Sequence, residues 1–289
     1  SLPVGLAGPV KLSLAGQEFS CFVPLATSEG ALIASVSRGL KAINQAGGAT
    51  TFVENAGMTR APVFALANGA SARAFAKHLE QAATRAKISE LTEATSSHLR
   101  FLGLRSFVRG RQVFVRFSFD TDLAMGMNMV TIALQKLWDD FLSTYPDIQM
   151  LSLSSNACTD KKASYINQLL GRGYSAQAEI FLSEQILVEV LKTTSSKLLT
   201  THQSKNHLGS NLAGSADHNM QFANVTAAFY LATGQDAAHV VEASQGETII
   251  EPANLGKAKS EAAGLYVAVY LPDLPLGSVG GGTGLPSQK

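Results

Sequence analysis

The spacing of apolar residues in the first sixty positions changes from a strand-like pattern to a helix-like one. Residues 9–26 contain two short apolar runs on either side of Gly16, which predicts two strands joined by a turn. After Ser28, which can cap a helix, four apolar residues recur at the helical period up to a stop at Gly47 and Gly48: Leu32, Val36, Leu40 and Ile43. Residues 51–60 predict a further strand.

From residue 61 the predicted elements follow the order βαββαβ. A strand at residues 62–66 precedes a helical stretch at residues 71–95, and the next two apolar runs predict a hairpin around Gly110. A helix from about residue 125 to 143 and a strand at residues 148–152 complete the set. This order of elements is typical of a ferredoxin-like domain.

The pattern after residue 153 is mainly helical. It predicts helices at residues 183–199 and 218–233 and a strand at residues 264–271. We therefore expect an α+β fold in which a small ferredoxin-like domain, residues 61–153, is inserted into a large, helix-rich domain. That large domain would be discontinuous and consist of residues 1–60 and 154–289.

Composition and charge exclude several classes of protein. Of the 289 residues, 46% are hydrophobic and 16% are charged, which suffices for a sizeable core and excludes general disorder. A net charge of +1 provides no broad basic field, so we expect no nucleic-acid partner. The longest apolar run, residues 262–271, is too short to span a membrane. Two cysteines, Cys21 and Cys158, are too few for a disulfide framework and favour a reducing, cytoplasmic setting.

The segment from Ser154 to Gly173 places two lysines where a helix disfavours them. It predicts a helix that opens at Asp160 and stops at Gly171, with Lys161 and Lys162 in its first turn. The helix macrodipole makes each cation there unfavourable by about 0.3–1 kcal/mol. One interpretation is a solvated helix start capped by Asp160. The other is an anion site, in which backbone N–H groups and both ammonium groups face a carboxylate, a phosphate or a developing oxyanion.

Two acids are candidates for proton chemistry. Glu29 lies in the first turn of its predicted helix, where the dipole favours the ionised form. To act as a general acid it would need burial or a nearby carboxylate, since these raise a carboxyl pKa. Asp236 follows a long apolar helix and, taken alone, is best interpreted as the cap of the next helix.

A methionine-rich segment at residues 122–135 also has two interpretations. Its methionines are suited to core packing, whereas Gly126 and Asn128 at a helix start would let a cofactor phosphate approach the backbone closely. The Gly-rich segment at residues 277–284 lacks the Lys-Ser/Thr pair of a P-loop, which excludes a Walker site. The sequence predicts no metal site.

Five segments together resemble the signature segments of one family. CTDKK at 158–162, LAMGMNM at 123–129, GQDAA at 234–238, GMTRAP at 57–62 and GSVGGGT at 277–283 resemble those of 3-hydroxy-3-methylglutaryl-coenzyme A (HMG-CoA) reductase. The matches extend over nearly the whole chain and are similar to the eukaryotic and archaeal class. The resemblance implies a large domain with an inserted, ferredoxin-like cofactor domain, and self-association as a dimer or tetramer.

The resemblance also implies an activity and a set of site residues. The reaction would be the reduction of HMG-CoA to mevalonate and free coenzyme A by two molecules of NADPH, or of NADH. Lys161 would stabilise the oxyanion, Glu29 would donate the proton, and Asp236 would link the two. The substrate would contact Arg60, Ser154, Asn156, Asp160, Lys162, Lys205 and Asn224. The cofactor would contact Ser96, Ser97, Met125, Gly126, Met127, Asn128, Val279 and Gly280.

The sequence departs from the family pattern at four points. Leu123 stands where the family has an aspartate, and the acid is one position earlier, at Asp122. Ser97 stands where an arginine holds the 2′-phosphate of NADPH, which weakens the preference for NADPH over NADH. Gln221 replaces a histidine, and none of the six histidines matches the family's catalytic one. The alternative to an active reductase is therefore a truncated or degenerate homologue that binds acyl-CoA or a partner chain without turnover.

Overall fold

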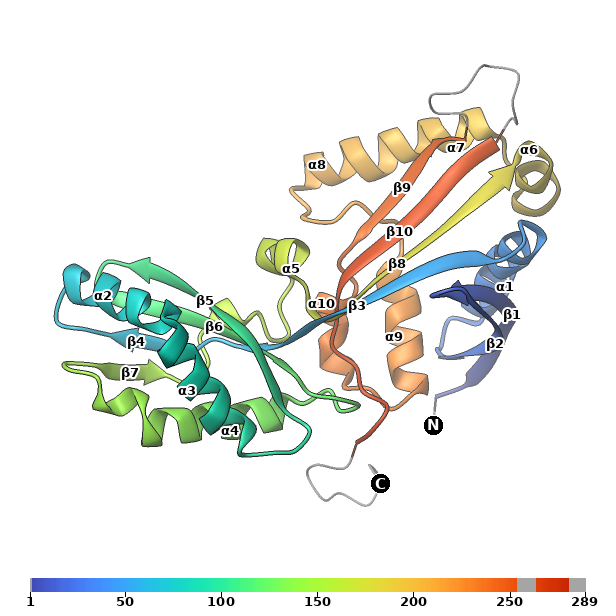
Figure 1. The fold of residues 1–289 in the computed structure, drawn as a ribbon. Coiled ribbons are helices and arrows are strands. Elements are labelled where there is room, and N and C mark those ends of the chain that lie inside the picture. The colour runs from blue at the N-terminus through green and yellow to red at the C-terminus, as the bar shows by residue number, and fades with distance from the viewer. Residues whose placement is uncertain (1, 254–263, 281–289) are drawn as a thin grey trace. The chain divides into compact units, whose positions relative to one another are not determined.

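The computed structural model describes residues 2–253 and 264–280, in which helices and strands are mixed throughout (Figure 1). Two compact units make up the chain. The first unit comprises Ser1–Glu54, Ala163–Leu169 and Ser175–Leu274, and the second comprises Asn55–Lys162, Leu170–Tyr174 and Pro275–Lys289. Both units contain helices and strands, so the fold is of the mixed α/β kind.

The second unit is built on an antiparallel sheet with the strand order β7–β4–β6–β5. The last residues of β3, Met58–Arg60, pair with β6 as well. The strands are β3 (Ala49–Arg60), β4 (Val63–Ala65), β5 (Arg100–Arg109), β6 (Gln112–Asp120) and β7 (Gln149–Ser152). The predicted hairpin is confirmed, and Gly110 adopts the left-handed conformation in its turn (φ 57°).

Three helices pack on this sheet through one cluster of buried apolar side chains that includes Phe64, Phe75, Val115 and Leu137. They are α2 (Gly69–Glu80), α3 (Ala82–Glu93) and α4 (Met127–Asp140), and the short η1 (Leu142–Thr144) follows α4. The prediction of one helical stretch at 71–95 is wrong in one respect. Gln81 is extended (ψ 138°), ends α2 and begins α3, so the stretch is two helices.

The first unit begins with the hairpin of β1 (Val4–Leu14) and β2 (Gln17–Ala26), as predicted around Gly16. β1 pairs in parallel with the start of β3, and the sheet order continues through β8 (Arg172–Ser183), β10 (Gly264–Leu274) and β9 (Glu247–Pro252). The sequence predicted neither β8 nor β9. The large domain was expected to be helix-rich, and that expectation understated its strands.

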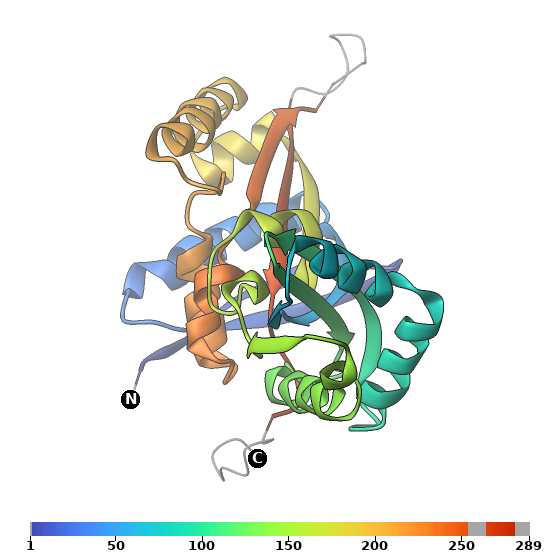
Figure 2. The ribbon, with the colours of Figure 1, turned by 90° about the vertical axis from the view of Figure 1, so that its left-hand side faces the viewer.

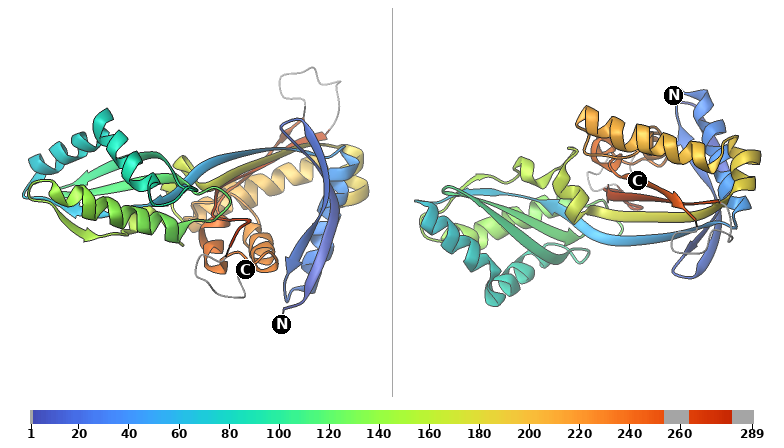
Figure 3. Two further views of the ribbon diagram at one scale, coloured as in Figure 1. Left: turned by 60° about the horizontal axis from the view of Figure 1, so that its bottom comes forward. Right: turned by 90° about the horizontal axis from the view of Figure 1, so that it is seen from above.

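Helix α1 (Gly30–Gln45) runs along the β1–β2 hairpin (Figure 3). Its buried Leu32 lies in a cluster with Ala7, Leu25 and Ala228, and Val36 and Leu40 pack against the same cluster. The helix ends before two glycines with positive φ, as predicted. Its N-cap position is Glu29 rather than Ser28, and the Glu29 side chain makes no capping hydrogen bond.

The helix predicted at residues 183–199 is interrupted. Lys192 adopts a left-handed conformation (φ 58°) and separates two runs of helical turns. The first run consists of α6 (Glu184–Ile186) and the π-helical η3 (Leu187–Leu191). The second consists of α7 (Ser195–Thr201), the π-helical η4 (His202–Gly209) and α8 (Ser210–Ala213), which form one rod (Figures 1 and 2).

The remaining helices are short or follow this rod. They are η2 (Asn156–Cys158), α5 (Tyr165–Leu170), α9 (Phe222–Ala232), η5 (Ala237–His239) and α10 (Val240–Ala243). α9 starts later than the predicted helix at 218–233 and packs on β2. Among residues 2–253 and 264–280, no helix combines the length and the apolar character that crossing a membrane requires. Cys21 and Cys158 are both free thiols.

Candidate functional site

The loop between β7 and α5 differs from the helix predicted there. Thr159 and Lys161 are both left-handed (φ 59° and 57°), and α5 begins only at Tyr165. The prediction that Lys161 and Lys162 occupy the first turn of a helix opening at Asp160 is therefore wrong. Left-handed backbone is unfavourable for residues with a β-carbon, and such strain is found preferentially at functional sites, where surrounding contacts hold it.

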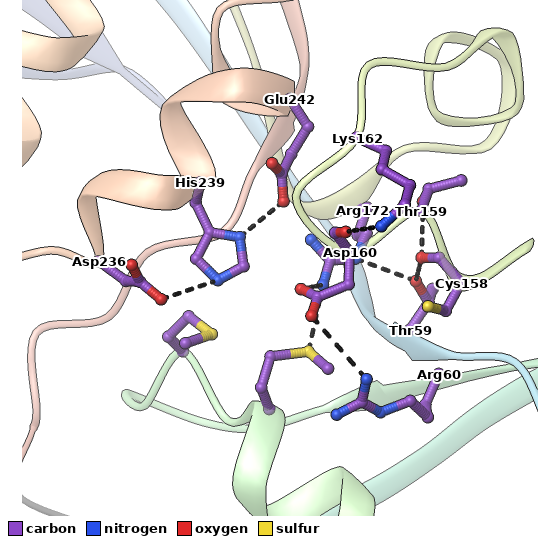
Figure 4. A network of polar contacts seen from close by, with 12 residues as sticks. Thr59, Arg60, Cys158, Thr159, Asp160, Lys162, Arg172, Asp236, His239 and Glu242 are labelled. Carbon is purple, nitrogen blue, oxygen red and sulfur yellow. Dashed lines mark hydrogen bonds and ion pairs between the residues drawn. The ribbon is translucent and has the colours of Figure 1, made fainter. Parts of the chain in front are cut away.

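The carboxylate of Asp160 is held by two arginines instead of capping a helix (Figure 4). One oxygen accepts a hydrogen bond from Arg172 Nη2 at 2.8 Å, and the other lies 3.8 Å from Arg60 Nη1. Arg172 is fully buried and also donates to Thr59 Oγ1 at 3.1 Å and to the sulfur of Met127 at 3.1 Å. These contacts fix the position of the acid within the second unit.

Arg60 forms hydrogen bonds both to a predicted substrate residue of this loop and to α4. It donates from Nη1 to Ser154 Oγ at 2.9 Å and from Nη2 to Thr131 Oγ1 at 2.7 Å. The side chain of Lys162 donates to the backbone oxygen of Asp160 at 3.2 Å. Lys161, Lys162 and Asn156 are exposed. The loop therefore carries more positive than negative charge, and it is chemically suited to bind an anion.

Glu29 and Asp236, the two predicted acids, belong to the first unit, whereas Lys161 belongs to the second. Asn224 on α9 donates from Nδ2 to Glu29 Oε2 at 3.4 Å, so one predicted substrate residue contacts the predicted proton donor. Asp236 caps η5, since its Oδ1 accepts from the backbone N–H of Ala238 at 3.0 Å, and the prediction of a cap is confirmed. Lys205 is exposed on η4.

Asp236 is followed by a buried histidine–glutamate pair (Figure 4). His239 Nε2 lies 3.7 Å from Asp236 Oδ2, and His239 Nδ1 lies 2.6 Å from Glu242 Oε1. The side chains of His239 and Glu242 are 1% and 0% exposed, respectively. Asp236, which is 40% exposed, thus lies at the outer end of a polar chain that continues into the core of the first unit.

Gly126 takes the N-cap position of α4 in a left-handed conformation (φ 84°). A β-carbon there would lie 2.3 Å from the side chain of Thr121, so only glycine fits. Met127 belongs to the core cluster of the second unit, and Met125 and Met129 pack against it, which confirms the core-packing interpretation. Asn128 is exposed in the first turn of α4.

The segment after β10 lies against the loop that precedes Gly126. Ala124 and Val279 form a parallel bridge, and the backbone N–H groups of Ser278 and Val279 donate to Leu123 O at 2.8 and 3.1 Å. Two predicted cofactor segments that are distant in sequence, 123–128 and 277–280, are thus neighbours within the second unit. Residues 281–283 of the Gly-rich segment lie outside the described residues.

The third predicted cofactor segment, Ser96–Ser97, lies in the loop between α3 and β5. Ser96 Oγ accepts from the backbone N–H of His98 at 3.2 Å, and His98 Nδ1 lies 2.7 Å from Asp122 Oδ2. The contact between His98 and Asp122 connects this loop to the start of the 123–128 segment. Glu93, at the end of α3, accepts hydrogen bonds from Phe101 N in β5 and from the Ser89 hydroxyl. These hydrogen bonds hold the pKa of the Glu93 carboxyl below its ordinary value.

Comparison with known proteins decides which family the chain represents. A model of the family described as hydroxymethylglutaryl-coenzyme A reductase matches residues 1–289. The reductase of Pyrococcus horikoshii is 40% identical over 288 residues, covering 100% of this chain and 68% of its own length. Reductase 2 of Dictyostelium discoideum is 42% identical over 289 residues, covering 100% and 53%. The chain belongs to the HMG-CoA reductase family.

The structural comparison agrees with this family at the level of the fold. An HMG-CoA reductase of Streptococcus pneumoniae superposes with a TM-score of 0.71 at 23% identity, covering 99% of this chain and 74% of its own. Another structure, described as a class II reductase of that species bound to NADPH, has a TM-score of 0.67 at 24% identity, covering 98% and 74%. The similarity to archaeal and eukaryotic HMG-CoA reductases, expected from the signature segments, is confirmed by the first two relatives.

Sequence reasoning missed two buried arginines and the buried acid–base pair of this HMG-CoA reductase homologue. Arg116, only 4% exposed, donates to Thr159 Oγ1 at 3.1 Å and to Gly171 O at 3.0 Å, which holds the strained loop. Arg172 stands between two glycines with positive φ, Gly171 and Gly173. The Gly-Arg-Gly sequence at residues 171–173 was the signal that could have identified Arg172 as a buried residue. His239 and Glu242 gave a weaker one, an i, i+3 pair directly after the predicted catalytic Asp236.

Proposed function

We propose that this chain is an oxidoreductase that converts HMG-CoA to mevalonate and coenzyme A with NAD(P)H. The observation that carries the proposal is the loop around Asp160. Its carboxylate lies within 4 Å of two guanidinium groups, at 2.8 and 3.8 Å, while Lys161 and Lys162 are exposed beside it. A loop with this excess of positive charge suits a substrate that carries a free carboxylate and a reaction that develops an oxyanion.

In this proposal Lys161 stabilises the oxyanion that forms at the carbonyl oxygen of the thioester and later at that of the aldehyde. Arg60 offers a planar guanidinium, the geometry that matches a carboxylate, and Ser154 shares that guanidinium at 2.9 Å. Asn156, Asp160, Lys162 and Lys205 complete the set that holds the hydroxymethylglutaryl group. The left-handed backbone at Lys161 supports this role, because strain of this kind is usually retained where a side chain must be aimed.

Glu29 is the proposed proton donor to the alkoxide, and Asn224 orients it from 3.4 Å. Asp236 is proposed to link Glu29 and Lys161 and to keep one proton shared between the two acids. The buried pair of His239 and Glu242 supports this arrangement, because it anchors the short helical turn that Asp236 caps. Reprotonation of the coenzyme A thiolate is not assigned to any described residue.

The second unit is proposed to be the ferredoxin-like domain, close to residues 61–153, that binds the nicotinamide cofactor. The cofactor would supply hydride. The residues present fit such a group, because Leu123 and Val279, whose side chains are 56% and 54% exposed, lie on two segments whose backbones pair just before α4. A helix N-terminus favours a pyrophosphate, and apolar side chains favour a nicotinamide ring. Met125, Gly126, Met127, Asn128 and Gly280 would complete this side.

Cofactor choice would depend on the loop that holds Ser96 and Ser97. Neither serine carries a charge, so this loop lacks the guanidinium with which the family holds the 2′-phosphate of NADPH. We propose that the chain accepts NADPH or NADH. We also propose self-association as a dimer or tetramer in the cytoplasm, as expected for the family.

The test is an assay of NADPH and NADH oxidation that depends on HMG-CoA. Lys161→Ala is expected to lower kcat by at least about a hundredfold, the effect of losing one oxyanion donor, with an unchanged circular dichroism spectrum. The matched control is Lys136→Ala, an exposed lysine on α4 that pairs with Asp140. Near-normal turnover in Lys161→Ala removes the lysine from the mechanism. Absence of turnover in the unaltered chain, with binding of acyl-CoA retained, favours the degenerate homologue instead.

A further inference from the structure

Three histidines of the first unit line one open pocket of about 570 Å³. His202 and His207 lie on the π-helical η4, and His218 follows α8. Residues of β9, among them Glu247 and Glu251, also line the pocket. The rod of helical turns that contains η4 runs beside β9 in Figure 1. The sequence predicted no role for any of these five residues.

The π-helical geometry of η4 is what brings His202 and His207 together. In an α-helix, residues five apart point about 140° away from each other, since each residue turns by about 100°. In η4 the i→i+5 pattern places both imidazoles on the same side, with Nε2 atoms 3.0 Å apart and ring centroids 4.5 Å apart. Turns of π-helix are rare and are found frequently at functional sites. The spacing in the sequence is therefore not recognisable as a metal motif.

The third imidazole is carried by a firmly held backbone. His218 forms a parallel bridge with Glu247, and the N–H of Thr248 donates to His218 O at 2.9 Å. Its ring centroid lies 5.6 Å from that of His207. The His218 Nε2 contact with Asn211 Oδ1 is long, at 3.3 Å, so a change of side-chain rotamer would break little.

A buried asparagine side chain fixes the orientation of the His202 ring. The buried Asn206 lies 3.0 Å from His202 Nδ1, and this contact directs Nε2 toward His207 and the pocket. Histidine ligands of metals are usually held in this way, by a hydrogen bond at the ring nitrogen that does not bind the metal. The Oδ1 atom of Asn206 is buried without a hydrogen-bond partner, and rotation of the amide would let it accept from Nδ1–H.

We propose that His202, His207 and His218 form a binding site for a divalent transition metal ion of the zinc type. Two nitrogens bound to tetrahedral zinc lie about 3.3 Å apart, close to the 3.0 Å between the two Nε2 atoms. Glu247, already in the pocket, or water is the fourth ligand. Imidazoles select zinc, nickel, cobalt or copper over magnesium and calcium, which prefer oxygen ligands. For both Nε2 atoms to bind the ion, the ring that carries its proton on Nε2 must carry it on Nδ1 instead, so no net proton is released from neutral imidazoles.

A metal bound here would fix the turn of η4 that carries Lys205. Lys205 lies between His202 and His207 in the sequence, and it is one of the residues proposed to hold the substrate. Two ligands from the same turn would stabilise the π-helical register over the α-helical one, in which the histidines diverge. The inference of a metal site stands independently of the proposed reductase activity.

The experiment is a titration of the full chain, carrying no histidine tag, with Zn²⁺ by isothermal calorimetry. We expect one ion per chain. His207→Ala and His218→Ala should each weaken binding by at least about tenfold, because each removes one ligand. Both side chains are only partly buried or exposed, so circular dichroism is expected to remain unchanged. His98→Ala, an exposed histidine of the second unit, is the matched control and should bind Zn²⁺ as tightly as the unaltered chain.

Co²⁺ provides a second measurement that reports the ligands directly. Its visible absorption bands depend on coordination, so they should appear with the unaltered chain and weaken or shift in His218→Ala. The proposal is overturned if the unaltered chain binds no Zn²⁺ at micromolar free concentration. It is equally overturned if His207→Ala and His218→Ala bind as tightly as the control, because the ion would then be held elsewhere, for example at the exposed thiol of Cys21.

Discussion

The buried ion pair of Arg172 and Asp160 makes a quantitative prediction about what holds the candidate site. Arg172 is 0% exposed and Asp160 is 21% exposed, and their N–O distance is 2.8 Å. Removing Arg172 deprives the partly buried Asp160 carboxylate of the nearer of its contacts with Arg172 and Arg60, and breaking a buried pair in this way costs about 3–5 kcal/mol. We expect Arg172→Met to lower the free energy of unfolding by that amount. Asp160→Asn retains an acceptor oxygen and should cost about 1.5–3 kcal/mol.

The double variant isolates the interaction energy between Arg172 and Asp160 from the other effects of the two single substitutions. In Arg172→Met with Asp160→Asn neither charge remains, so the loss should be about 1–3 kcal/mol smaller than the sum of the two single losses. Urea unfolding provides the measurement. The single tryptophan, Trp138, lies on α4 and stacks on Phe64 in the core of the second unit, so its fluorescence reports the unfolding of that unit.

The matched control is an ion pair of the same formal charge on the surface of α4. Lys136 Nζ and Asp140 Oδ2 are closer, at 2.6 Å, but their side chains are 45% and 42% exposed. Such helical pairs contribute about 0.3–0.5 kcal/mol because water screens them. The same cycle with Lys136→Met and Asp140→Asn should give a coupling of that size. If the buried pair couples no more strongly than the control, burial does not strengthen it, and the reasoning is refuted.

Two further predictions concern the cofactor side of the second unit. Gly126→Ala places a β-carbon 2.3 Å from the Thr121 side chain and should lower both the Tm and the cofactor affinity. The control is Gly39→Ala, whose β-carbon would meet no atom within 4 Å and should raise the free energy of unfolding by about 0.5–1 kcal/mol. Equal Tm values and equal KM values for the cofactor in the two variants would contradict this prediction. Hydrogen bonds from Phe101 N and the Ser89 hydroxyl hold the pKa of Glu93 below its ordinary value, so its contribution to stability is present above that ordinary value and is lost as the pH falls through the lowered pKa. Glu93→Gln should therefore flatten the acid limb of the stability profile, and an unchanged limb would refute the assignment.

The elements that the sequence predicted are those with a clear period. Apart from the buried Arg116, β6 alternates partly buried and buried positions because one face packs on helices, and α1 shows four apolar residues on one side. β8 gave no such signal. Its residues RGYSAQAEIFLS mix small, polar and apolar side chains without alternation, and six of the twelve are only partly buried. Gln81 was missed as a break because glutamine is a good helix former and only tertiary context makes it extended.

The candidate site was predicted in part and for an incorrect structural reason. The sequence predicted Lys161 and Lys162 in the first turn of a helix, whereas the helix starts at Tyr165. Left-handed backbone is expected at glycine or asparagine, and here it occurs at Thr159 and Lys161, so no local pattern predicts it. Arg172 was missed because its partners, Thr59, Met127 and Asp160, are distant in the sequence and meet only in the folded second unit.

The role of Asp160 follows from the difference between buried and exposed charge. Its carboxylate contacts two guanidinium groups, those of Arg172 at 2.8 Å and Arg60 at 3.8 Å, and so orients both. Water screens the exposed Lys161 and Lys162, but it cannot reorient around the fully buried Arg172. The positions of these guanidinium groups are therefore fixed by the fold of the loop, and the proposed anion would bind with little reorganisation. In the proposed function, the contact that stabilises the fold of the loop would thus also prepare it electrostatically for a carboxylate or an oxyanion.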